Sequence, residues 1–266
     1  MLININGISI DYRDQGSGVP VVFIHAFPLN QTMWDIQLST LQNSFRVITI
    51  DLRGFGRSDA PPGPYSMTQI ADDVRALLYH LDIHRATIVG LSMGGYISLA
   101  FLRKYPRIVR ALVLADTRAT ADTPEARERR LISADKAERE GARAIADDMV
   151  PMLLGRTSLD SRPDVVLRVR KMIEGNASQG IAAAQRGMSE RVDSTTLLTQ
   201  LELPCQVIVG SEDVLTPLSE AENLHRGIKG ARFNVINRAG HLSNLEQPEE
   251  FNRVLSDFIG SLDHGK

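Results

Sequence analysis

The stretch ATIVGLSMGG, residues 86–95, decides the fold of this 266-residue chain. Its first four residues are apolar or β-branched, which is typical of a short buried strand. The pattern Gly-x-Ser-x-Gly follows directly, and the residues from Met93 onward have the apolar spacing of a helix. The pentapeptide alone is a weak motif, because glycine is common. Its place between a strand and a helix predicts a sharp turn that holds Ser92 in strained backbone geometry.

Short apolar runs recur along the chain and alternate with amphipathic segments, as expected for a mostly parallel sheet covered by helices. Asn6-Gly7 is a hairpin turn sequence, so we expect the sheet to begin with an antiparallel pair. Helices are expected at residues 66–81, where a capping box comes first, at 93–105 and at 248–262. The eight expected strands span residues 2–5, 8–13, 21–24, 46–50, 86–89, 109–114, 205–209 and 232–236.

One region interrupts this alternation. From about residue 118 to residue 198 the chain has no strand-like run, and it is rich in Ala, Arg, Glu and Met with helical spacing. The apolar runs on either side fit one sheet, so we expect an α/β core formed by residues 1–117 and 199–266, with a helical cap inserted at 118–198. A separate helical domain is the alternative.

Proline and glycine residues divide this expected cap. Pro124, Pro151 and Pro163 are expected to separate its helices, because proline cannot continue a helical hydrogen-bond ladder. Residues 175–187, which begin and end with glycine, are expected to give another break.

Composition restricts the partners and the compartment. The 30 basic and 32 acidic residues give a net charge of -2 without a basic block, so no nucleic-acid or membrane partner is expected. No apolar run approaches the roughly 20 residues that cross a bilayer, and the first residues do not resemble a signal peptide. We therefore expect a cytoplasmic protein. The single cysteine, Cys205, is expected to be a buried strand residue without a catalytic role.

A serine in such a turn needs partners, because its hydroxyl is a poor nucleophile without a base. The acid and the histidine should follow Ser92 in that order. Asp213 comes shortly after the apolar run 205–209, and His241 comes shortly after the run 232–236. Both lie just past the carboxyl end of an expected strand, where open α/β sheets place their sites. We therefore predict that the three side chains converge.

Other residues compete for these roles. We prefer Asp213 to the adjacent Glu212 because of its spacing after the strand, and Asp116 is a weaker substitute. His25 follows a strand but precedes the serine, so we interpret it as structural. The remaining histidines fall in or beside helices or in the C-terminal tail, and we interpret them as solvated or packed: His80, His84, His225 and His264.

The loop His25-Ala26-Phe27-Pro28 and the run at residues 51–58 add to these motifs, and together they make the chain resemble the α/β-hydrolase family over nearly its whole length. Within that family it resembles 3-oxoadipate enol-lactonases, small aryl-esterases and cofactor-free perhydrolases. The resemblance implies an oxyanion hole formed by the backbone amides of Phe27 and Met93. The family usually has His-Gly in the first loop, where this chain has Ala26, a residue with less backbone freedom.

The run DLRGFGRS at residues 51–58 is rich in glycine, but it lacks the Gly-Lys-Ser or Gly-Lys-Thr ending of a phosphate loop. We interpret it as a structural turn.

The residues predict acyl transfer in two steps. His241 removes the proton as Ser92 attacks an ester or lactone carbonyl, Asp213 orients the imidazole, and water then releases the acyl group. The expected activity is that of a carboxylesterase or lactonase, with enol-lactones and acyl-homoserine lactones as candidate substrates. No metal or organic cofactor is expected, because no histidine or cysteine cluster suggests one. Serine at position 92 argues against haloalkane and epoxide substrates, which need aspartate there.

Several alternatives remain open from sequence. C–C bond hydrolysis, perhydrolysis and amide hydrolysis use the same three residues, and a ligand receptor of this fold with slow turnover is a further alternative. The sequence does not determine the oligomeric state. Met149, Met152, Leu153 and Leu154 either line an apolar pocket or pack between cap helices, and we favour packing.

Overall fold

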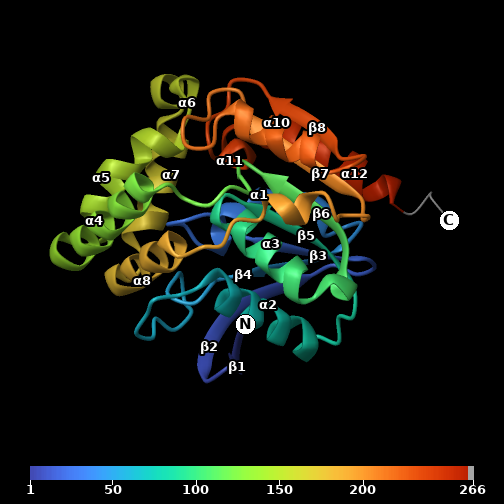
Figure 1. Cartoon of the computed structure of the whole chain (residues 1–266), viewed down its shortest axis with the longest axis horizontal. Coiled ribbons are helices and arrows are strands. Elements are labelled where there is room, and N and C mark those ends of the chain that lie inside the picture. Colours follow the sequence, from blue (N-terminus) through green and yellow to red (C-terminus); the bar gives the residue numbers. More distant parts are fainter. Residues whose placement is uncertain (263–266) are drawn as a thin grey trace.

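The predicted strands form one sheet in a computed structural model that describes residues 1–262 (Figure 1). Within that range the order is β1-β2-β4-β3-β5-β6-β7-β8; the first two pairs are antiparallel and the other pairs parallel. The eight-stranded, mostly parallel sheet predicted from the sequence is therefore confirmed. The strands are β1 (Leu2–Ile5), β2 (Ile8–Gln15), β3 (Pro20–Ile24), β4 (Arg46–Ile50), β5 (Ala86–Leu91), β6 (Val109–Ala115), β7 (Cys205–Gly210) and β8 (Arg232–Ile236).

The helices fill the connections between strands. In the described part of the chain they are α1 (Asp35–Leu41), α2 (Met67–His80), α3 (Met93–Lys104), α4 (Pro124–Glu140), α5 (Ala142–Leu153), α6 (Arg156–Ser161), α7 (Pro163–Glu174), α8 (Ser178–Ser189), α9 (Thr195–Leu198), α10 (Leu218–Gly227), α11 (Ser243–Glu246) and α12 (Pro248–Ser261), with short 3₁₀ turns η1 (Gln31–Trp34) and η2 (Pro106–Ile108). None of the helices in residues 1–262 is long and apolar enough to span a membrane.

The chain enters the sheet through the expected hairpin. Asn6 and Gly7 have φ values of 50° and 78°, and Ile5 pairs with Ile8 across the turn. Two consecutive residues with positive φ give a turn whose twist matches that of paired strands. The Asn-Gly sequence thus directs the antiparallel start of the sheet.

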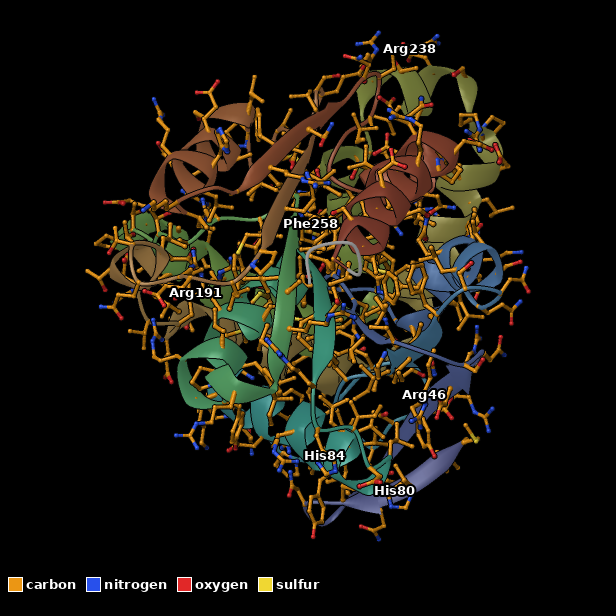
Figure 2. The ribbon with its side chains drawn as sticks, turned by 90° about the vertical axis from the view of Figure 1, so that its right-hand side faces the viewer. Arg46, His80, His84, Arg191, Arg238 and Phe258 are labelled. Carbon is orange, nitrogen blue, oxygen red and sulfur yellow. The ribbon has the colours of Figure 1, made fainter. Side chains whose placement is uncertain are left out.

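Two helix pairs cover the sheet. The helices α2 and α3 pack against each other, and α3 lies on β3, β5 and β6; α1 packs with α12, and these two contact β4 and β8 respectively. Figure 2 shows the strands between the two layers, with Phe258 of α12 turned toward them. The strands β3 to β7 are buried over nearly their whole length, which is why they are apolar runs without alternation, whereas the edge strand β8 is only partly buried.

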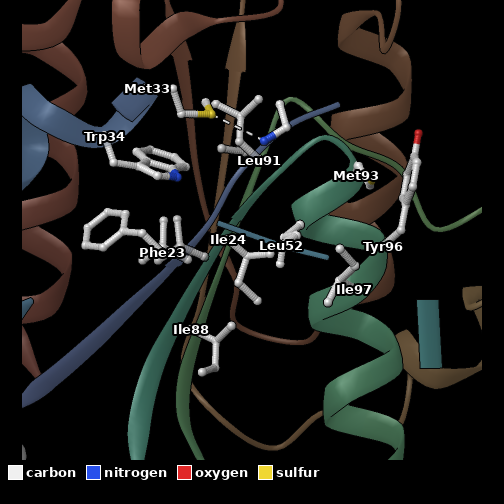
Figure 3. Close-up of a cluster of buried hydrophobic side chains, with 14 of the residues drawn as sticks. Phe23, Ile24, Met33, Trp34, Leu52, Ile88, Leu91, Met93, Tyr96 and Ile97 are labelled. Carbon is white, nitrogen blue, oxygen red and sulfur yellow. Dashed lines mark hydrogen bonds between the residues drawn. The ribbon is translucent and has the colours of Figure 1, made fainter. Parts of the chain in front are cut away.

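The strands β3 and β5, which lead to the loops around Ser92, share a part of the core with η1. Phe23, Ile24, Trp34 and Ile88 are fully buried there, and the Phe23 and Trp34 rings have centroids 5.0 Å apart (Figure 3). Burying each such side chain contributes roughly 1.5–3 kcal/mol. This packing fixes β3 and β5 relative to each other, and so fixes the two loops that follow them.

The helices α4–α9 lie between β6 and β7, which are neighbours in the sheet. In Figure 1, α4, α5, α6, α7 and α8 gather on one side of the molecule. Pro124 and Pro163 begin α4 and α7, as predicted. The break expected at Pro151 is wrong, because Pro151 lies inside the last turn of α5, where its missing N–H removes only one bond of the ladder. The helix ends two residues later, at Leu153, and a separate break between α4 and α5 comes at Gly141, whose φ is 85°.

The break expected across residues 175–187 is also only partly correct. Gly175 ends α7, but Gly180 and Gly187 lie inside α8. A Cβ atom at Gly180 would collide with the Gly54 backbone, and one at Gly187 would collide with the Tyr65 carbonyl. These glycines allow α8 to approach the core closely.

We predict that Gly90→Ala lowers the free energy of unfolding by about 1–3 kcal/mol, because a Cβ atom in β5 would collide with the Gly94 carbonyl and the Ser98 hydroxyl. Urea denaturation measures the effect. Gly260→Ala in α12 is the matched control, since nothing lies within 4 Å of its added Cβ. Equal stability of the two variants would contradict the prediction.

Candidate active site

Ser92 lies at the turn between β5 and α3, as the sequence predicts. Its φ is 57° and its ψ is -113°, a conformation that few residues other than glycine adopt. Added Cβ atoms at Gly90 and Gly94 would collide with neighbouring backbone, so glycine is required at both positions. The turn places Ser92 directly before the N-terminus of α3, where backbone amides have no helical partner.

The structure brings His241 and Asp213 to Ser92. The His241 Nε2 atom lies 2.7 Å from Ser92 Oγ, and its Nδ1 atom lies 2.8 Å from Asp213 Oδ2. The three residues follow β5, β7 and β8, so they meet at the carboxyl edge of the sheet. Because a carboxylate only accepts hydrogen bonds, the imidazole proton belongs on Nδ1, and Nε2 is free to accept from the Ser92 hydroxyl.

A short turn fixes the Asp213 carboxylate. Its Oδ1 accepts hydrogen bonds from the amides of Leu215 (2.8 Å) and Thr216 (3.0 Å), and its Oδ2 accepts from the Thr216 hydroxyl (2.6 Å). Burial by itself would raise the pKa of Asp213, but the charge of His241 and these hydrogen bonds outweigh it and hold the pKa below its usual value. Asp213 is therefore ionised beside the imidazole.

His241 is 2% exposed. Burial lowers its pKa, but the neighbouring Asp213 carboxylate more than compensates, and the net effect raises the pKa above 6.5. The pair is thus arranged to accept a proton at Nε2 and to stabilise the resulting charge.

Two backbone amides near Ser92 have no partner. Neither Phe27 N nor Met93 N donates a hydrogen bond to another residue in the range 1–262. The Ala26 amide, in contrast, donates to Met33 Sδ at 3.3 Å (Figure 3). Ala26 has no positive φ, so alanine in place of the usual glycine introduces no backbone strain.

His25 is a structural residue, as we interpret it from the sequence. Its Nδ1 donates to the Ala26 carbonyl (2.9 Å), and its Nε2 accepts from the Leu52 amide (3.1 Å). Burial lowers the pKa of His25 to about 4. It is a neutral imidazole that joins the loops after β3 and β4.

Comparison with known proteins agrees with this geometry. The model of the alpha/beta hydrolase fold family matches residues 19–248. The chain belongs to this family. The relatives of this alpha/beta hydrolase include 3-oxoadipate enol-lactonase 2 of Acinetobacter baylyi, which is 29% identical over 235 residues, 88% of this chain and 86% of that protein.

Solved structures place the chain among esterases and lactonases of the family. A thermophilic esterase from Thermogutta terrifontis, solved with malate bound, is 41% identical with a TM-score of 0.95, over 98% of this chain and 97% of that one. The enol-lactonase from Burkholderia xenovorans LB400 is 29% identical with a TM-score of 0.91, over 98% and 100% of the chains. The chain is therefore a hydrolase of the esterase and lactonase type, and the predicted resemblance and fold class are confirmed.

Asp116, the weaker substitute for the acid, directly follows β6, at the same edge of the sheet as the other groups of this hydrolase site. It is fully buried, accepts from the Gly210 amide (2.7 Å) and lies 2.5 Å from the Ser243 hydroxyl. Burial, with the nearby charge of Asp213, raises the pKa of Asp116 well above its usual value. Asp116 connects the loop that carries Asp213 with the helix that follows His241.

Two further carboxylates, neither expected to have this role, join the helical segment to the same loops. Glu246 accepts from the amides of Gly155 (2.8 Å), Gly240 (2.9 Å) and Leu242 (3.3 Å). Glu212 accepts from the amide (2.8 Å) and the hydroxyl (2.6 Å) of Thr157. Each acid is close in sequence to His241 or Asp213, but nothing local identifies its partner across the fold.

The hydrogen bonds from Thr216 to Asp213 were not predicted from the sequence, although a local pattern indicates them. Asp213 binds the amides two and three residues later, which is a common Asx turn, and threonine at the third position adds a hydroxyl donor.

A cavity of about 710 Å³ opens onto Ser92 and His241. This volume is within the range of small-molecule sites. The helices α4, α5 and α8 contribute to its wall. Met149 and Met152 line it, so the packing interpretation is wrong for Met152, whereas Met149 both lines the cavity and packs against the core. Leu153 and Leu154 are buried, as packing requires.

The remaining candidates lie elsewhere. His80 and His84 are exposed (Figure 2), and His225 stacks on Phe233 with ring centroids 5.2 Å apart. His264 lies outside the described residues. Cys205 is buried in β7, and burial raises the pKa of its thiol to about 12. Within residues 1–262, no group of three or more His, Cys, Asp or Glu side chains is arranged to hold a metal.

The run at residues 51–58 is a structural turn, as interpreted. Asp51 accepts from the amides of Gln31 (2.8 Å) and Arg57 (2.9 Å), and the Ser58 hydroxyl donates to the Asp51 carbonyl (2.6 Å). The polar groups of Asp51 are thus bound by donors from this run and from Gln31.

We predict that Glu246→Gln lowers the free energy of unfolding by about 1–3 kcal/mol, because the amide NH₂ group would face backbone donors in a buried site. Urea denaturation tests this. Glu202→Gln, at an exposed position, is the control and should change stability by less than about 0.5 kcal/mol. A loss no larger than that of the control would show that these bonds contribute little.

Proposed function

We propose that this hydrolase cleaves carboxylic esters or lactones through an acyl-enzyme on Ser92. The observation that carries the proposal is the 2.7 Å separation of Ser92 Oγ and His241 Nε2, with Asp213 on the far side of the imidazole. A serine hydroxyl becomes a competent nucleophile when a positioned base accepts its proton.

In the first step, Ser92 Oγ attacks the carbonyl carbon while His241 Nε2 accepts the hydroxyl proton. The negative charge that develops on the carbonyl oxygen is stabilised by the free amides of Phe27 and Met93, and Asp213 stabilises the imidazolium. Collapse of the intermediate expels the alcohol, which takes the proton from His241. In a lactone the alcohol stays attached to the acyl chain.

In the second step, water attacks the acyl-enzyme with His241 again as the base, and Ser92 recovers its proton as the acid product leaves. Each step uses the same amides for the oxyanion. The proposed chemistry uses these side chains and amides without a metal or organic cofactor.

We further propose that residues 118–198 form a cap over a core of residues 1–117 and 199–266. Support comes from the cavity wall, to which α4, α5 and α8 contribute beside Ser92. Such a cap would select substrates by shape and shield the reacting groups from bulk solvent, while leaving room for the water that hydrolyses the acyl-enzyme.

We predict that Ser92→Ala lowers kcat for p-nitrophenyl butyrate by at least about 1,000-fold, because no other group can form the acyl-enzyme. Absorbance of released nitrophenolate measures the rate, and a thermal melt verifies folding. Ser39→Ala, at an exposed position on α1, is the control and should keep full activity. Substantial turnover by Ser92→Ala would disprove the mechanism, and tight binding without turnover in the unaltered chain would favour the receptor alternative.

The activity should also depend on pH. Because the raised pKa of His241 favours its protonated form, kcat/KM for a neutral ester should rise with pH through a midpoint above 6.5. Asp213→Asn removes the carboxylate that raises this pKa, so the midpoint should fall while kcat drops by roughly 10⁴-fold. The pH profile of kcat/KM, measured for both proteins, tests this. Identical midpoints would rule out the assigned role of Asp213.

A panel of simple esters, enol-lactones and acyl-homoserine lactones, compared by kcat/KM, distinguishes the substrate classes within this proposal. Addition of hydrogen peroxide to the ester reaction tests the perhydrolase alternative on the same residues.

A further inference from the structure

The wall of the cavity beside Ser92 carries several arginines. Arg118, from the loop after β6, and Arg129 and Arg130, from α4, all line it. The acidic residues in the same lining are Asp148 and Glu220.

One buried carboxylate serves three of the arginines around this wall. The Asp122 side chain is 0% exposed, and it accepts from Arg118 Nη2 (2.9 Å), from Arg191 Nη2 (3.0 Å) and from Arg130 Nε. Three guanidinium groups surround this one carboxylate, and Arg191 also interacts with the charge of Asp193. The cluster therefore carries more positive charge than the Asp122 carboxylate alone neutralises.

The acids of the lining do not cancel this excess. Asp148 is occupied by Lys136, whose Nζ lies 2.6 Å from Asp148 Oδ2. Glu220 is half-buried and interacts with Arg118 through its charge without a hydrogen bond to it among the described residues. Arg129 adds another positive charge, so the cavity wall is net positive.

Two of these arginines have donors to spare. Arg118 Nε is buried and makes no hydrogen bond within residues 1–262. Arg129 is exposed and takes part in no hydrogen bond or ion pair there, although its charge influences Glu125 one turn earlier on α4. A buried donor without a partner is unfavourable unless a ligand or water satisfies it.

We propose that Arg118 and Arg129 bind a carboxylate group of the substrate, so that the preferred esters or lactones carry a negative charge away from the scissile bond. This inference rests on the proposed function, because it concerns the cavity that Ser92 enters. Guanidinium groups match the planar carboxylate with two parallel N–H donors, and the partly buried position of Arg118 strengthens the contact.

The test compares esters that differ only in charge. Monomethyl glutarate and methyl pentanoate have the same chain length, as do monomethyl adipate and methyl hexanoate, and acid release at constant pH gives kcat/KM for each. We expect the purified full chain to prefer the charged member of at least one pair by about tenfold or more, as one charge-assisted contact permits. Raising the ionic strength should reduce the preference.

Arg118→Gln and Arg129→Gln should each reduce this charged-to-neutral ratio by about tenfold. Arg127→Gln is the matched control: Arg127 is exposed on the same helix as Arg129 but does not line the cavity, and its ratio should equal that of the unaltered chain. The ratio is an internal control for folding, because a partly unfolded variant loses activity on both esters equally. Arg129→Gln, at an exposed position, also does not disturb the Asp122 cluster.

A ratio of one or below in the unaltered chain, or an unchanged ratio in both variants, would overturn the carboxylate subsite. If neutral esters are still cleaved and Ser92→Ala abolishes that cleavage, the proposed function stands while the subsite fails. If the unaltered chain cleaves no ester of either pair, the subsite fails, and p-nitrophenyl butyrate and the lactone panel decide the proposed function separately.

Discussion

The backbone turn at Ser92 is the constraint on which the rest of the site depends. A serine with φ of 57° is unfavourable by about 1–3 kcal/mol, and surrounding structure must hold it there. The Ser92 amide donates to the Ala115 carbonyl (2.9 Å), and the Thr117 hydroxyl donates to the Ser92 carbonyl (2.8 Å). Residues at the end of β6 and just after it thus hold the turn by hydrogen bonds, and the buried side chains of β5 pack beneath it. With the turn fixed, the hydroxyl, the Met93 amide and the start of α3 have defined positions.

The parallel sheet then determines which groups can reach that hydroxyl. Neighbouring strands β6, β7 and β8 end at the same edge, and each delivers an ionisable side chain: Asp116, Asp213 and His241. Burial raises the pKa of Asp116, whereas the charge of His241 and its hydrogen bond, with the donors of Thr216, hold the pKa of Asp213 low. The environment thereby separates two acids that are near one another, so that the negative charge concentrates on the one that faces the imidazole.

The helical segment between β6 and β7 is connected to these loops by hydrogen bonds to two carboxylates. Glu212 and Glu246 bind backbone at residues 155–157, at the junction of α5 and α6, and each is adjacent in sequence to a loop that carries Asp213 or His241. These hydrogen bonds connect the α5–α6 junction with the loops that carry Asp213 and His241. Asp122 pairs with Arg130 of α4 and with Arg118 and Arg191 of the loops at either end of the segment, and of these arginines Arg118 and Arg130 line the cavity.

Sequence alone determined the features that depend on short stretches of chain. Apolar runs locate the strands, the Asn6-Gly7 turn sets the first pairing, and glycines around Ser92 mark the strained turn, because each of these is a local conformational requirement. Asp213 and His241 were also predictable, since strand ends converge at one edge. Only the tertiary structure decided that His241 pairs with Asp213 and not with Asp116, that α5 continues through Pro151, and that three arginines share Asp122. These outcomes depend on contacts between residues distant in sequence, whose burial and charge no local pattern encodes.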